Sequence, residues 1–154
     1  MVQGSVRKSR VLIMYHDIKQ VETEIQKLLE DYQQAAMGTH RGAYPEVSKV
    51  TPVVENGTIY LLLSDLSRHT DNIRKNPIVT LYFADRNKKR TQMNNPRLTL
   101  YGTLERVEKT EQALKKFDKR DKGATMYGQF GDFNIWRFVE DDRMYIAGFG
   151  KAYK

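Results

Sequence analysis

The stretch SDLSRHTDNIRKNP, residues 64–77, decides how the rest of the sequence is organised. It separates two short apolar runs, 59–63 and 78–83, whose composition is typical of strands. Its middle is typical of a short helix, because Ser64 is a suitable N-cap and Asn76-Pro77 forbids helical continuation. The sequence therefore predicts a strand, a short helix and a second strand.

The first turn of this predicted helix carries groups that suit an anion. Ser64, Ser67, Arg68 and His69 fall there, where free backbone N–H groups and the helix dipole favour negative charge. Hydroxyls and a guanidinium at such a place would form a phosphate cradle. In the alternative interpretation Ser64 is only a cap and Arg68 only a solvated cation. The residues alone leave both interpretations open.

The composition limits the class of protein. A chain of 154 residues with 40% hydrophobic content suits one globular domain, and we expect an N-terminal arm over 1–16 and a single domain over 17–154. No run is long enough to span a membrane, and no secretory signal pattern follows the basic first ten residues, so a cytoplasmic protein is expected. The absence of cysteine excludes disulfides, thiol catalysis and cysteine-ligated metals.

The net charge of +7, from 26 basic and 19 acidic residues, favours an anionic partner. A nucleotide-like cofactor, a porphyrin with propionates and nucleic acid would all satisfy it. The cations cluster at 7–10, 86–90 and 115–122, and these runs can also be read as solvated surface. Charge alone does not choose among these partners.

Two further segments have the periodicity of helices. Residues 17–36 carry apolar side chains three and four positions apart with charged residues between them, which predicts an amphipathic helix. Residues 110–121 show the same pattern. Within residues 64–77, Leu66 and Ile73 have a spacing that lets both face inward.

The segment before residue 64 is β-rich. A short strand over 37–40, a turn at 41–45 and a strand over 46–54 are expected, with Pro52 placing an edge or bulge in the last. Residues 55–58, Glu-Asn-Gly-Thr, form the strongest hairpin signal in the chain.

The later strands complete the expected sheet. After a polar loop over 85–95, residues 97–107 predict a long strand with a bulge at Gly102. Residues 133–139 and 144–149, separated by four charged residues, predict a closing hairpin. Six or seven strands with few helices indicate a mainly β protein with helices, a small barrel or sandwich, rather than a doubly wound sheet.

Protein-supplied chemistry has little support in the sequence. His16, His40 and His69 are the three histidines, and no pair has a metal-chelating spacing on one helix face, so no metal site is expected. No serine lies in a nucleophile elbow, and no catalytic residue can be named. Trp136 is interpreted as a core or interface residue rather than a base-stacking platform. If the chain is an enzyme, a cofactor supplies the reactive atom.

From about residue 28 to 153 the chain resembles the flavin-binding split-barrel superfamily of pyridoxamine-phosphate oxidases, and within it the haem-utilisation (HugZ/HutZ-type) branch. The stretches that carry the likeness are GAYP at 42–45 with Val47-Ser48 following, SDLSRHTDNIRKNP at 64–77, PRLTLYGTLERV at 96–107 and GFGKAY at 148–153. The resemblance implies a six-stranded antiparallel split β-barrel that acts as a homodimer, with cofactor sites in grooves between subunits.

The resemblance also implies an FMN site. In the oxidase relatives a Ser-Arg-Lys triplet holds the flavin phosphate, and Ser67, Arg68 and His69 stand at that position here. The strand after the Gly-x-Pro turn lines the isoalloxazine ring in those relatives. The candidate cofactor-binding residues are Ser48, Lys49, Val50, Thr51, Ser64, Ser67, Arg68, His69 and Arg97.

The haem branch implies an alternative cofactor. There, haem at the dimer interface is bound through a histidine in a C-terminal tail beyond the GFG motif. The printed sequence ends at Lys154, so haem ligation is expected from His16, His40 or His69, or not at all. Asp132 stands where that branch has an acidic residue near the haem.

Three hypotheses result. The leading one is an FMN-binding split-barrel protein, with flavin-dependent oxidoreductase activity if it is an enzyme. The second is a haem-binding or haem-degrading protein. The third is a non-enzymatic barrel for a ligand or nucleic acid, suggested by the basic loops and the sixteen aromatic residues (nine Tyr, six Phe, one Trp). A homodimer is expected and no membrane, and nucleic acid is the least favoured partner.

Overall fold

The computed structural model of the chain describes residues 18–31, 34–84, 95–148 and 151–153. Its strands are β1 (Ala35–Arg41), β2 (Tyr44–Val50), β3 (Val53–Glu55), β4 (Thr58–Ser64), β5 (Ile78–Ala84), β6 (Arg97–Val107), β7 (Phe133–Gly148) and β8 (Lys151–Tyr153). Its helices are α1 (Ile18–Asp31), α2 (Arg68–Lys75), α3 (Glu111–Lys115), the 3₁₀ helix η3 (Lys116–Lys119) and α4 (Ala124–Gly128). The predicted arm at 1–16 and nearly all of the predicted loop at 85–95 lie outside these ranges.

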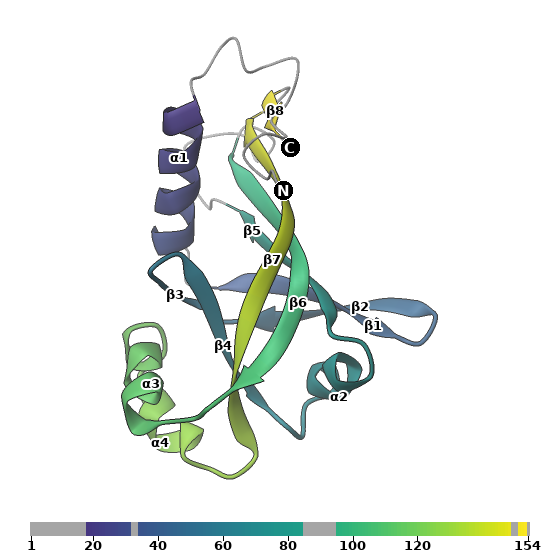
Figure 1. Ribbon diagram of the computed structural model, residues 1–154, viewed down its shortest axis with the longest axis vertical. Coiled ribbons are helices and arrows are strands. Elements are labelled where there is room, and N and C mark those ends of the chain that lie inside the picture. The colour runs from purple at the N-terminus through teal and green to yellow at the C-terminus, as the bar shows by residue number, and fades with distance from the viewer. Residues whose placement is uncertain (1–17, 32–33, 85–94, 149–150, 154) are drawn as a thin grey trace.

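The described strands form one antiparallel sheet in the order β2-β1-β5-β6-β7-β4-β3, with β8 paired to β7 (Figure 1). The prediction of a mainly β protein with helices is confirmed, but the prediction of six strands is wrong. The end strands β2 and β3 are joined by Thr51-Pro52 alone. Because this short link connects the two edges of one sheet, the sheet must curl until its edges approach at that point.

Two of the predicted strand boundaries fail for different reasons. The expected strand over 46–54 is divided at Pro52, which cannot donate a ladder hydrogen bond, and its two parts lie at opposite edges of the sheet. The expected hairpin over 133–149 is a single strand, β7, which pairs with β6 from Val107↔Ile135 to Arg97↔Ile146. Its charged middle lies at the surface, where Arg143 pairs with Glu140.

Three local predictions are confirmed. Asn56 and Gly57 both have positive φ, 51° and 79°, which is the backbone of a tight hairpin turn, and β3 and β4 pair across it. The register of β6 and β7 shifts between Tyr101 and Gly102, at the predicted bulge. The turn between β1 and β2 contains Gly42, with φ 58°.

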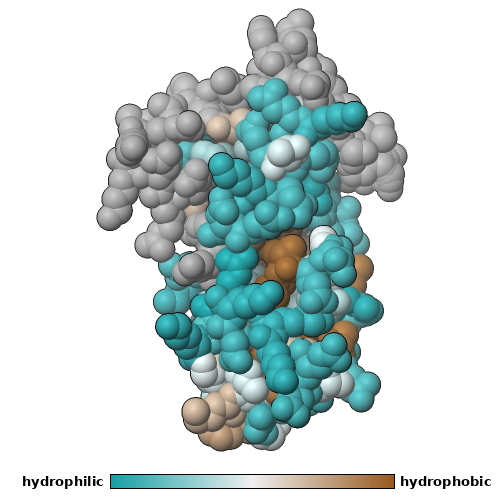
Figure 2. All heavy atoms as spheres, turned by 90° about the vertical axis from the view of Figure 1, so that its left-hand side faces the viewer, coloured by the Kyte–Doolittle hydropathy of each residue, from teal (hydrophilic) through white to brown (hydrophobic). Residues whose placement is uncertain are grey.

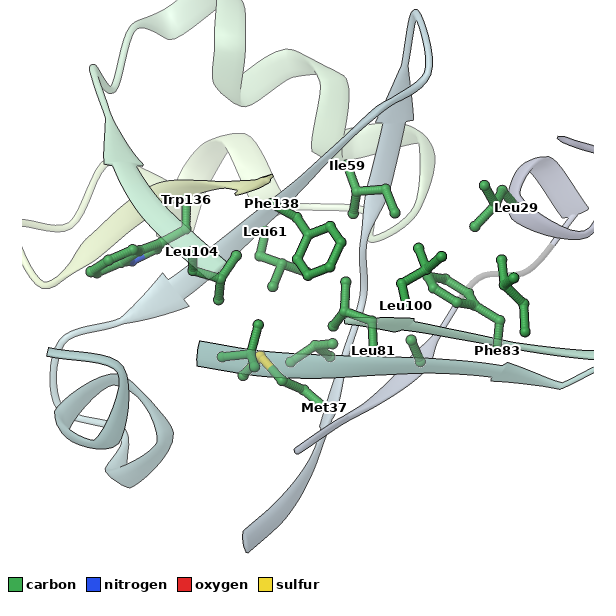
Figure 3. Packing of buried hydrophobic residues seen from close by; sticks show 14 of the residues in the cluster. Leu29, Met37, Ile59, Leu61, Leu81, Phe83, Leu100, Leu104, Trp136 and Phe138 are labelled. Carbon is green, nitrogen blue, oxygen red and sulfur yellow. The ribbon is translucent and has the colours of Figure 1, made fainter. Parts of the chain in front are cut away.

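The core lies inside the curled sheet. Figure 3 shows Leu61 of β4, Leu104 of β6, and Trp136 and Phe138 of β7 gathered in one part of it. Trp136 is 6% exposed, so the prediction of a core position is confirmed. Leu29 of α1 packs against the same cluster. Helix α1 ends earlier than predicted, because Ala35 and Ala36 belong to β1.

A second, smaller core lies on the other face of β4 and β7. Leu114, Phe117 and Ala124 from α3, η3 and α4 pack there against Val53 and Ile135. Helix α4 was not predicted. The face that α1 and α3 present is largely hydrophilic, with a small hydrophobic area at its centre (Figure 2). None of the helices in the described ranges has the length and hydropathy to cross a membrane.

Helix α2 begins later than predicted. Its N-cap is Ser67, not Ser64, because the hydroxyl of Ser64 accepts from the Leu66 N–H and donates to Asp132. Leu66 therefore lies in a turn before the helix and is 84% exposed, so the prediction that it faces inward is wrong. Ile73 is 1% exposed, as predicted. The helix ends at Lys75, with Asn76 as its C-cap before Pro77, as predicted.

Candidate functional site

A pocket of about 210 Å³ lies where the two edges of the sheet diverge. Strand β3 pairs only with Thr58–Tyr60, so residues 61–64 of β4 keep one edge free of strand pairing among the described residues. The end of β2 is the other edge. The residues that line the pocket between them are Lys49, Val50, Thr51, Leu61, Leu62, Leu63, Ser64, Ser67, His69 and Phe133.

Helix α2 supplies the polar end of this pocket. It lies beside the β1–β2 hairpin (Figure 1), and its N-terminus brings Ser67 and His69 to the pocket. The Ser67 side chain makes no capping hydrogen bond in the described structure, so its hydroxyl is not used by the helix. A helix N-terminus with a hydroxyl not engaged in capping favours a negatively charged group.

His69 is held from one side only. Its Nδ1 lies 3.2 Å from the hydroxyl of Ser48 on β2. Its Nε2 is buried and has no hydrogen-bond partner within the described part of the chain. Burial lowers the pKa of His69 below its ordinary 6.5, and the nearby carboxylate of Glu46 opposes this shift. The imidazole is therefore predominantly neutral at pH 7 and has one nitrogen available for a ligand.

Ser64 lines the pocket, but its hydroxyl is already engaged. It donates to a carboxylate oxygen of Asp132 at 2.7 Å, and its backbone carbonyl accepts from the Thr70 hydroxyl at 2.7 Å. The Asp132 carboxylate thus binds the Ser64 hydroxyl but is not itself among the residues that line the pocket. Ser64 consequently contributes more to the shape of the turn before α2 than to the binding of an anion.

Arg68 is not among the lining residues, because its guanidinium is paired elsewhere. Its Nε donates to Glu46 Oε1 at 3.0 Å, and one terminal nitrogen lies 2.6 Å from Glu46 Oε2. Arg41 and Asn72 bind the same carboxylate, each at about 3 Å (3.1 Å and 3.0 Å). The pKa of Glu46 is lowered, chiefly by the hydrogen bond from Arg68 and against the effect of burial. The carboxylate is ionised at neutral pH.

Arg97 lies far from this pocket along the same sheet. It pairs with Ile146 of β7, whereas Ser64 pairs with Phe133 at the start of β7. A strand rises about 3.3 Å per residue, so these two positions are roughly 40 Å apart along β7. Within one chain Arg97 does not contribute to the pocket. Its guanidinium binds the backbone carbonyl of Asn95 at 3.3 Å.

The structure thus brings together most, but not all, of the residues predicted from the sequence. Lys49, Val50, Thr51, Ser64, Ser67 and His69 line one pocket, and Ser48 contacts it through His69. Sequence reasoning missed Glu46 and the unpaired edge of β4 at residues 61–63. Alternation along β2 could have found Glu46, because Glu46, Ser48 and Val50 occupy one face of that strand.

Beside this pocket, β1 and β2 carry a shallow depression of about 320 Å³. The lining residues are Gln34, Ala35, Ala36, Val47, Ser48 and Lys49, so Ser48 links the two hollows through its contact with His69 and Lys49 borders both. Nowhere in the described ranges do three or more His, Asp or Glu side chains gather as a metal site would require.

Comparison with known proteins agrees with this architecture. The family model described as "CREG, beta-barrel" matches residues 2–154. No curated protein matches the sequence significantly.

Solved structures with the same fold include three proteins from bacteria. A heme binding protein from Mycobacterium smegmatis has a TM-score of 0.77 at 21% identity, over 85% of this chain and 56% of that chain. ChuZ from Campylobacter jejuni has a TM-score of 0.77 at 20% identity, over 89% and 59%. HutZ, the heme storage protein from Vibrio cholerae, has a TM-score of 0.68 at 23% identity, over 78% and 89%. The chain spans little more than half the length of the first two, and at these identities the likeness concerns the fold.

Proposed function

The chain belongs to the CREG β-barrel family, within the split-barrel superfamily of pyridoxamine 5′-phosphate oxidase-like proteins, and on this premise we propose that it binds FMN in the pocket between its sheet edges. One observation carries the proposal. A pocket between two strand edges ends at a helix N-terminus where the Nε2 of His69 has no partner within the described residues. Such a buried, unpaired nitrogen calls for a ligand atom.

The residues present fit an anionic cofactor with a flat apolar part. Ser67, His69 and the first N–H groups of α2 would hold the phosphate. The unpaired edge of β4 at residues 61–63 and the end of β2 would bound the ring system. When bound, FMN supplies hydride exchange at its N5 atom, and this chain contributes position, exclusion of water and hydrogen bonds.

A second candidate is haem, because of how His69 is held. The contact of Nδ1 with Ser48 leaves the buried Nε2 as the nitrogen without a partner in the described residues, and a histidine that ligates a metal characteristically has its other nitrogen fixed in this way. Two of the three solved structures are described as heme proteins, the heme binding protein from Mycobacterium smegmatis and HutZ from Vibrio cholerae. A haem-utilisation role is the alternative function on this ground.

We also propose that the protein is a homodimer. Val47, Tyr82 and Tyr101 are 71%, 40% and 39% exposed, and pairing across β2, β1, β5 and β6 places them on one face of the sheet. Between them lie the small residues Ala36 and Gly38. Two copies related by a two-fold axis could set the tyrosines of one over the small residues of the other. The shallow depression beside the pocket lies on this face.

Absorption spectra of the purified protein with added FMN or haem test the cofactor proposals. We expect His69→Ala and Ser67→Ala each to weaken FMN binding by about 10- to 150-fold, the loss of one hydrogen bond to a charged group. His40→Ala is the matched control, because His40 is exposed on β1. For haem, His69→Ala should remove the ligand-dependent shift of the Soret band. Binding of neither cofactor, or equal binding by His69→Ala and His40→Ala, would contradict the proposal.

A further inference from the structure

The carboxylate of Glu46 binds the guanidinium groups of two arginines, Arg68 and Arg41. Both of its oxygens are bound by Arg68, at 3.0 Å and 2.6 Å, and one is also 3.1 Å from Nε of Arg41. This two-pronged geometry is how a guanidinium binds a phosphate or carboxylate of a ligand. Glu46 therefore fills a place that an external anion could take.

The packing of α2 against β2 places this ion pair next to the pocket. Glu46 and Ser48 face the same side of β2, and the consecutive residues Arg68 and His69 of α2 each contact one of them. His69 lines the pocket. The Arg68 guanidinium is thus attached one residue away from a pocket-lining side chain and is turned toward Glu46.

Arg68 is held in this position by charge rather than by packing. Its side chain is 68% exposed, whereas that of Glu46 is 17% exposed. Glu46 is also fixed by Asn72, whose amide bridges it to the Thr39 hydroxyl. The carboxylate is therefore the static partner, and the long, solvated arginine is the one that can move.

We propose that Glu46 is an internal counter-anion that competes with the anionic arm of the ligand for Arg68 and so sets the affinity of the pocket for anions. The proposal rests on the proposed function, in that the pocket is where this ligand binds. A phosphate or a carboxylate would both compete in this way. The anionic group of a ligand can bind the Arg68 guanidinium only after it displaces the Glu46 carboxylate. The wild-type pocket therefore discriminates against ligands whose anionic group is weakly charged.

The competing explanation is that Glu46 only docks α2 onto β1 and β2 through Asn72. The two roles predict opposite results for Glu46→Gln. A counter-anion, once neutralised, releases Arg68 and the affinity for anions rises. A docking residue, once weakened, loosens α2 and the affinity falls.

The test is titration with inorganic phosphate, followed by NMR, of the wild type, Glu46→Gln and Glu46→Gln/Arg68→Gln. We expect Glu46→Gln to bind phosphate about 2- to 5-fold more tightly, the effect of one partly exposed charge pair, and the double variant to lose this gain. Glu55→Gln is the matched control, because Glu55 is paired with Lys116 away from α2. Equal or weaker phosphate binding by Glu46→Gln would overturn the inference.

Titrations with cofactors that carry or lack the charged group distinguish this inference from the proposed function on which it rests. FMN should gain affinity from Glu46→Gln while riboflavin, which lacks the phosphate, should not, and haem should gain while its dimethyl ester should not. If neither cofactor binds the wild type, the proposed function fails, but the phosphate titration still decides the role of Glu46.

Should Glu46→Gln not fold, the Arg68 Nε–H resonance of the wild type is the second measurement. It should shift on phosphate addition, and an unmoved resonance would overturn the inference.

Discussion

At the scale of single residues, His69 is the group whose protonation the fold most clearly restrains. It is half-buried against β2, and burial lowers its pKa more than Glu46 raises it. Below pH 6.5 the unfolded chain takes up a proton on this imidazole that the folded chain resists. The folded protein is therefore not destabilised by this group at a pH above 6.5, the pKa of the imidazole in the unfolded chain. The free energy of unfolding declines as the pH falls from 6.5 toward the lower pKa of His69 in the folded protein.

We predict that the free energy of unfolding falls between pH 7 and pH 5 and that His69→Gln makes this fall shallower. Urea unfolding at a series of pH values measures it. His40→Gln is the control, since His40 is exposed and should leave the slope as it is. An identical slope for wild type and His69→Gln would show that burial does not restrain this imidazole.

At the scale of elements, the β6–β7 pair depends on Gly102. A Cβ at this position would meet the backbone carbonyl of Val139 and would lie 2.8 Å from Cζ of Phe138. Phe138 belongs to the core, and the backbone of β7 is held on both sides along this stretch. A glycine is therefore required at this bulge, because the strands approach too closely there for a Cβ.

Gly102→Ala should destabilise the protein by about 1–3 kcal/mol, the usual cost of overpacking a core. Gly131→Ala is the control, because a Cβ there meets nothing within 4 Å, and we expect a change within roughly 0.5 kcal/mol. Chemical denaturation of the two variants measures the difference. Equal stability of Gly102→Ala and Gly131→Ala would mean that β7 can shift to accept the methyl group.

At the scale of the whole molecule, the curled sheet has a covered face and an open one. Helices α3 and α4 cover β4 and β7, while Val47, Tyr82 and Tyr101 remain exposed on the face of β2, β5 and β6. Exposed aromatic residues around small ones are typical of a surface that meets a partner. The proposed homodimer would bury this face and bring the second copy beside the shallow depression that borders the pocket.

Tyr101→Asp should therefore convert a dimer into monomers, because it would bury a charge within the contact. Light scattering coupled to size exclusion measures the mass at several concentrations. Met126→Asp is the control, since Met126 is 72% exposed on α4 and away from this face. A wild-type protein that is monomeric at tens of micromolar, a concentration at which standard-sized interfaces hold, would contradict the proposed dimer.

The local features of this protein were predictable because each depends on a few neighbouring residues. Asn56-Gly57 adopts positive φ at low cost, Asn76-Pro77 stops a helix by steric exclusion, and alternation over 97–107 specifies a strand. Six of the ten pocket-lining residues were also predicted: Ser64, Ser67 and His69 from their place at the start of the expected helix, and residues 49–51 from the family resemblance.

The tertiary structure alone decided how these elements share their polar groups. Ser64 ends β4 rather than capping α2, and its hydroxyl binds Asp132, 68 positions later. Arg68 faces Glu46 because the packing of α2 against β2 brings the two side chains together. The continuity of β7 depended likewise on its pairing with β6, which runs through the charged residues where a turn was expected. Backbone preferences act within a few residues, whereas a long-range ion pair or hydrogen bond exists only once the sheet has curled and its register is established.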